Sequence, residues 1–80
     1  MTERIKLIWD FRGPSAKPIA EHHAKHLAEF AKTEKLQNTF TGIEEINPMH
    51  HIAFLVVEKP LMNTLRETLK PNRGQIYDEP

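Results

Sequence analysis

The chain has 80 residues and no cysteine, so it predicts one small domain without disulfides. Its eleven basic and eleven acidic residues cancel, which argues against a nucleic-acid partner, because such proteins usually carry a basic surface. No apolar stretch approaches the roughly 20 residues that cross a bilayer, and no leader-like segment follows Met1. These features predict a cytoplasmic protein with no membrane partner.

Residues 4–12 alternate in polarity and predict a strand. Its apolar face consists of Ile5, Leu7, Trp9 and Phe11. Its mixed face consists of Arg4, Lys6, Ile8, Asp10 and Arg12. After a Gly-Pro break, residues 15 to about 35 predict an amphipathic helix with Ser15 as its N-cap and Pro18 in its first turn.

The next segments predict a β-hairpin. Residues 38–46 suit a strand, but Gly42 and two adjacent glutamates place it at a sheet edge, since edges carry irregularity and charge. The Asn-Pro-Met sequence at 47–49 is typical of a turn. Residues 51–57 form the longest apolar run of the chain, and both alternating faces of that run are apolar. This third strand is therefore predicted at the centre of the sheet.

A second helix is predicted from Pro60 to Pro71, which ends it. Residues 71–80 then form a tail, a short fourth strand around 75–77, or an arm on a partner subunit. The element order predicts an α+β fold of the ferredoxin-like β-α-β-β-α(-β) type spanning 1–80. Both helices would cover one face of an antiparallel sheet. The other face would expose Ile8 and half of the third strand, an apolar patch that predicts a homodimer through facing sheets.

Five histidines are the unusual feature of the composition. His22 and His26 lie one helical turn apart, and Glu29 follows on the same flank. The two histidines can bind a divalent metal with Glu29 or a strand histidine as the third ligand, which is one hypothesis for the function. The alternative is that His22 and His26 lie on a solvated flank and that His23 lies at the edge of the core.

A second set of candidates lies at the end of the first and third strands. The side chains of His50 and His51 point to opposite faces of the third strand. One of them and a helix histidine, His26 or His23, could lie beside Asp10 at this end of the sheet. Asp10 would orient an imidazole for proton transfer. Ligand-binding candidates beside this pair are Trp9, Arg12, His50 and His51. Among these, Arg12 would hold a carboxylate or phosphate. The alternative is that all of these are ordinary strand-end and core residues.

The strand 5–10, the helix segment 22–27 and the apolar third strand together resemble the dimeric α/β-barrel superfamily of ferredoxin-like proteins. Within it, the histidine-bearing helix is similar to the YCII-related group. The superfamily includes monooxygenases, muconolactone isomerases and stress proteins. The resemblance implies a His–Asp pair, for which Asp10 and one of His22, His23 or His26 are the candidates. The chain is shorter than most such proteins, which leaves the fourth strand open.

Three functional hypotheses remain from the sequence. The first is a dimer that binds a small polar or aromatic molecule between sheet and helices, with or without proton transfer by a His–Asp pair. The second is a metal-binding module, and the third is an interaction or regulatory subunit without chemistry. No phosphate-binding loop, dinucleotide motif or nucleophile motif is present, so no cofactor other than a divalent metal is predicted.

Overall fold

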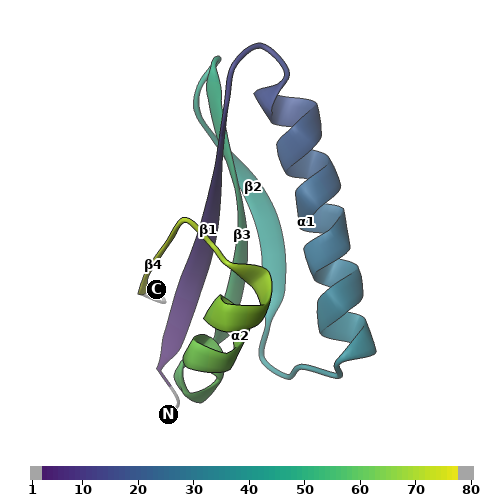
Figure 1. Ribbon diagram of the computed structural model, residues 1–80, viewed down its shortest axis with the longest axis vertical. Coiled ribbons are helices and arrows are strands. Elements are labelled where there is room, and N and C mark those ends of the chain that lie inside the picture. The colour runs from purple at the N-terminus through teal and green to yellow at the C-terminus, as the bar shows by residue number, and fades with distance from the viewer. Residues whose placement is uncertain (1–2, 78–80) are drawn as a thin grey trace.

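The computed structural model describes residues 3–77. In chain order these form β1 (Arg4–Arg12), α1 (Ala16–Thr33), β2 (Phe40–Asn47), β3 (His50–Glu58), the 3-10 turn η1 (Lys59–Leu61), α2 (Met62–Leu69) and β4 (Arg73–Ile76) (Figure 1). The strands make one antiparallel sheet in the order β2-β3-β1-β4. This α+β arrangement is compatible with ferredoxin-like topology.

The third strand occupies the interior of the sheet, as its apolar run predicts. β3 pairs with β1 on one side and with β2 on the other. Its odd-numbered residues Ala53, Leu55 and Val57 are buried on one face, and Ile52 and Val56 are buried on the other. The prediction that β2 lies at an edge is also confirmed. A strand that buries both faces needs neighbours on both sides, which explains its position.

Both helices pack on one face of the sheet. Leu27 of α1 and Leu65 of α2 belong to the same core cluster as Leu7 and Leu55 of the strands. Figure 1 shows α1 running along the sheet, while the shorter α2 lies near the two ends of the chain. The buried Ala20 lets α1 approach the strands closely. No helix among residues 3–77 combines the length and the apolar character that a bilayer crossing requires.

We call the sheet face that points away from the helices the open face. The strand registers assign to it Lys6, Ile8, Asp10, Arg12, Phe40, Gly42, Glu44, His50, Ile52, Phe54, Val56, Arg73 and Gln75.

The predicted exposed apolar patch, formed by Ile8 and half of the third strand, is largely buried in a single chain, and that prediction is wrong; Phe40 of β2 remains exposed on this face. Ile8 is only 2% exposed in a single chain, and Val56 is fully buried. The Phe54 ring on the same face is covered by a neighbouring side chain. The Lys6 ammonium lies 4.4 Å from the centre of the Phe54 ring and forms an ion pair with Glu44. The Lys6 side chain is only 12% exposed, so its charged end is held over the apolar ring and beside Glu44.

The predicted element boundaries need small corrections. Ser15 occupies the N-cap position of α1, but its side chain makes no capping hydrogen bond. Pro60 lies in η1 rather than at the first position of α2, which begins at Met62. The 47–49 turn is confirmed, with Asn47 Oδ1 accepting a 2.9 Å hydrogen bond from the Met49 amide. Of the predicted tail 71–80, residues 73–76 form a strand beside β1, two positions before the expected start at 75, and residues 78–80 lie outside the described part of the chain.

Candidate functional site

Asp10 is the centre of a polar cluster on the open face. Its Oδ1 lies 2.8 Å from His50 Nε2. Arg73 donates to both carboxylate oxygens, from Nε to Oδ2 at 3.2 Å and from Nη2 to Oδ1 at 3.1 Å. We call Asp10, His50 and Arg73 the Asp10 cluster. It joins three strands, because its members come from β1, β3 and β4.

The backbone fixes these side chains in place. Asp10 and His50 belong to directly paired strands and lie diagonally on the same face, a relation that brings long side chains into reach. Asn72 ties the start of β4 to β1, because its Oδ1 accepts from the Asp10 amide at 2.8 Å and its own amide donates to the Ile8 carbonyl at 2.9 Å. These two bonds hold Arg73 beside Asp10.

The cluster is partly shielded from solvent. The side chains of Asp10 and His50 are 16% and 13% exposed, whereas that of Arg73 is 48% exposed. The hydrogen bond from Arg73 holds the pKa of Asp10 below its ordinary value of 3.8; burial opposes this effect, and the bond to His50 adds to it. Asp10 is therefore a carboxylate at neutral pH and can only accept hydrogen bonds.

The ionised carboxylate determines which nitrogen of a neutral His50 carries the proton. Because Asp10 can only accept, His50 Nε2 must donate, and Nδ1 is left as a proton acceptor. Arg12 lies directly opposite His50 in the β1–β3 register, and both belong to the open face. Arg12 is exposed, and its guanidinium makes no hydrogen bond or ion pair within residues 3–77. A proton acceptor, His50 Nδ1, and a cation without a partner among the described residues, Arg12, therefore belong to neighbouring positions on the open face.

The structure does not bring a helix histidine to Asp10. His23 lies on the other side of the sheet, with its ring centre 5.0 Å from that of Trp9 and 5.4 Å from that of Phe11. Its Nε2 is buried and has no hydrogen-bond partner in the described part of the chain. Burial lowers the pKa of His23 below its ordinary value of 6.5, and positive charge on His26 and His22 lowers it further. His23 is thus a neutral residue at the core edge.

Two of the predicted ligand-binding residues lie in the core. Trp9 is 6% exposed, and its Nε1 donates to the Leu69 carbonyl at 3.2 Å. His51 is 4% exposed and pairs with Phe11 across the strands. Its Nε2 lies 3.3 Å from Glu45 Oε1 but without the geometry of a hydrogen bond. Both side chains face the helices and are separated by the sheet from the Asp10 cluster.

The three predicted metal ligands are exposed on α1. His22 and His26 meet, with their Nε2 atoms 2.9 Å apart. Glu29 does not complete a set with them: over residues 3–77, no three or more His, Asp or Glu side chains gather closely enough to hold a metal ion.

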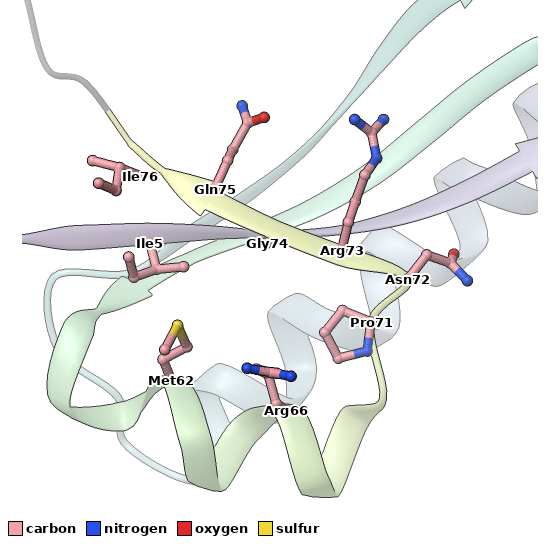
Figure 2. A pocket seen from close by; sticks show the side chains of 9 residues that line it. All are labelled: Ile5, Met62, Arg66, Pro71, Asn72, Arg73, Gly74, Gln75 and Ile76. Carbon is pink, nitrogen blue, oxygen red and sulfur yellow. The ribbon is translucent and has the colours of Figure 1, made fainter.

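A pocket of about 430 Å³ lies between β4 and α2, on the helix side of the sheet. Figure 2 shows the Met62 and Arg66 side chains rising toward it from α2, while Arg73 and Gln75 point away on the far side of the strand. The lining residues are Ile5, Met62, Arg66, Pro71, Asn72, Arg73, Gly74, Gln75 and Ile76. None of the site residues predicted from the sequence lines this pocket.

Arg73 and Asn72 are the site residues that sequence reasoning missed. Both follow the second helix by only a few positions and resemble a solvated tail. If the pairing of β4 with β1 had been predicted, it would have been enough to place Arg73 opposite Ile8 and therefore next to Asp10. Comparison with protein-family models, curated proteins and solved structures gives no significant match.

Proposed function

We propose that this chain is a ferredoxin-like protein that binds a small oxyanion-bearing molecule on the open face and uses His50 as a proton acceptor. The observation that supports this most is the 2.8 Å contact between His50 and an Asp10 carboxylate that Arg73 holds ionised. The binding surface thus differs from the predicted one, which lay between sheet and helices.

The chemistry follows from the roles of three residues. Arg12 binds a carboxylate or phosphate oxygen of the ligand through its planar set of donors. His50 Nδ1 takes a proton from an acidic O–H or C–H group of the same molecule, leaving an anion on the ligand and an imidazolium on the protein. Asp10 stabilises that imidazolium without taking the proton, because its own pKa is lowered. General-base assistance of this kind contributes about 10²–10⁴-fold to a rate.

Charge on the open face favours an anionic ligand. Lys6 and Glu44 neutralise each other. Arg73 neutralises the charge of Asp10 through an ion pair. The positive charge of Arg12, beside His50, is therefore not neutralised by either of these pairs. A cationic ligand would be repelled by this guanidinium and a neutral one would gain a weaker hydrogen bond, whereas an oxyanion gains a charge-assisted hydrogen bond.

A second copy of the chain is proposed to cover this face. The site lies on a sheet surface, and proton transfer is favoured where water is excluded. One end of the open face offers aromatic surface for such a contact: Phe40 is 39% exposed and its ring lies 5.4 Å from that of Tyr77 and 6.0 Å from that of Phe54. Sedimentation should then find a dimer, converted to a monomer by Phe40→Glu. A monomeric native chain at high concentration would contradict the dimer.

The binding proposal is tested by NMR titration of the histidine side chains with a panel of small carboxylates and inorganic phosphate. At least one panel member should shift the His50 imidazole signals, and Arg12→Gln should weaken that binding about tenfold or more. Arg66→Gln is the matched control, because it removes an exposed arginine from the other side of the sheet. Unchanged His50 signals with every compound, or equal affinity in Arg12→Gln and native protein, would refute the proposal.

A further inference from the structure

The exposed face of α1 carries a histidine pair that is independent of the Asp10 cluster. His22 and His26 are one turn apart, so their side chains lie on the same face of the helix. Their ring centres are 4.4 Å apart at an interplanar angle of 79°, and their Nε2 atoms are 2.9 Å apart. The two Nε2 atoms, which are the outer nitrogens of the rings, are therefore at hydrogen-bond distance from one another.

Only one proton can occupy the space between these nitrogens. A contact of 2.9 Å requires one Nε2 to donate and the other to accept, so each neutral pair contains one free lone pair and one replaceable proton. A divalent metal ion can bind both Nε2 atoms once the proton of the donating ring has moved, by exchange with water, from its Nε2 to its Nδ1, so that both ligands are neutral imidazoles and no net proton is released. Because both residues are on one helix, most of the ordering cost of bringing two ligands together has been met by folding.

The distance between the nitrogens indicates the kind of metal. With metal–nitrogen bonds of about 2.0–2.1 Å, ligands at a right angle lie about 2.9 Å apart, whereas ligands at the tetrahedral angle lie about 3.3 Å apart. The observed 2.9 Å is the length of the hydrogen bond between the two rings, and adjacent ligands of a square-planar or tetragonal metal site have the same separation, so a metal of that geometry could bind with little movement of the two nitrogens. That geometry is preferred by Cu²⁺, which also stands highest among the divalent first-row metals in affinity for imidazole.

We propose that His22 and His26 form a two-histidine Cu²⁺ site whose remaining positions are taken by water. Two protein ligands suffice for Cu²⁺, whereas structural zinc sites normally use four. The site is separate from the proposed function, since α1 covers the opposite face of the sheet from the Asp10 cluster.

The test is calorimetric titration of untagged full-length protein with Cu²⁺, accompanied by electron paramagnetic resonance. One Cu²⁺ should bind per chain, with an axial spectrum showing coupling to two nitrogens. His22→Ala and His26→Ala should each weaken binding about tenfold or more, because each leaves a single imidazole. Both side chains are exposed, so both variants should fold, which circular dichroism verifies.

Two controls make the assignment specific. Glu29→Ala should leave Cu²⁺ affinity unchanged, and a loss as large as that of His22→Ala would refute the two-ligand site. The double variant His22→Ala/His26→Ala measures binding at the amino terminus and at the other histidines. Equal affinity in this double variant and in the native protein would overturn the proposal. A fourfold-symmetric Cu²⁺ spectrum without histidine coupling in the native protein would do so too.

Discussion

Replacement of Asp10 by asparagine tests the Asp10 cluster most simply, because it removes the charge and keeps the size. The carboxylate accepts from His50 at 2.8 Å and from Arg73 at 3.1 and 3.2 Å. A hydrogen bond to a charged group contributes about 1.5–3 kcal/mol, but solvent weakens the pair with Arg73, and asparagine retains one acceptor. We therefore expect a loss of about 2 kcal/mol in the free energy of unfolding.

For a domain of this size, that loss lowers the melting temperature by roughly 8–16 °C. Thermal and urea unfolding at neutral pH, followed by circular dichroism, measure it. Arg73→Gln removes the same contact from the other side, so the double variant with Asp10→Asn should lose less than the sum of the single variants. A loss below about 0.5 kcal/mol for Asp10→Asn, which is typical of ordinary surface substitutions, would refute the reasoning.

The same variant has a defined dependence on pH. Because the pKa of Asp10 is lowered in the folded state, its stabilising contribution is present above its ordinary pKa of 3.8 and is lost as the pH falls through the folded value. The stability difference between native protein and Asp10→Asn should therefore shrink on acidification below about pH 4. A difference that stays constant down to the lowest pH at which the protein folds would contradict the assigned ion pair.

Two further substitutions probe other contacts. His23→Phe should stabilise the protein by about 1 kcal/mol, because it replaces an unpartnered buried nitrogen with a ring that fits against Trp9 and Phe11. Because the pKa of His23 is lowered in the folded protein, the native chain loses stability as the pH falls from 6.5 toward that lowered pKa. The stability gained by His23→Phe should therefore grow over this pH range. Denaturant titrations that show a constant gain, or a loss, would count against this reasoning. Gly42→Ala should destabilise by about 1–3 kcal/mol, because its Cβ would lie 2.6 Å from Phe54 Cζ. Unchanged urea midpoints in this variant would show that the Phe54 ring moves aside freely.

The sheet interior and its edge were predictable because each depends on a local pattern. The run from His51 to Val57 offers no polar face, so only an interior strand can bury it. Gly42 indicated an edge or a close approach, and the structure shows both, since β2 is an edge strand and Phe54 packs against that glycine. Alternation alone also assigned Trp9 and Asp10 to opposite faces.

The Asp10 cluster was only half predictable, because one of its members depends on a long-range pairing. Alternation places Asp10 and one of the two strand histidines on the same face, but it does not specify which helix residues lie on that face, and none does. Arg73 reaches Asp10 only because β4, a four-residue strand with every residue exposed, pairs with β1. The missing apolar patch has a similar cause: the cover that Lys6 gives Phe54 depends on side-chain conformation.

Proton transfer by His50 requires that its Nε2 proton be held by the Asp10 carboxylate on the open face. Long-range ¹H–¹⁵N correlation spectra of the histidine side chains, recorded in mildly alkaline buffer, test this directly. They should show His50 with Nε2 protonated and Nδ1 unprotonated, and this preference should weaken in Asp10→Asn, because the amide oxygen that remains is a weaker acceptor than a carboxylate. A proton found on His50 Nδ1 in the native protein, or a tautomer ratio unaffected by Asp10→Asn, would contradict the account.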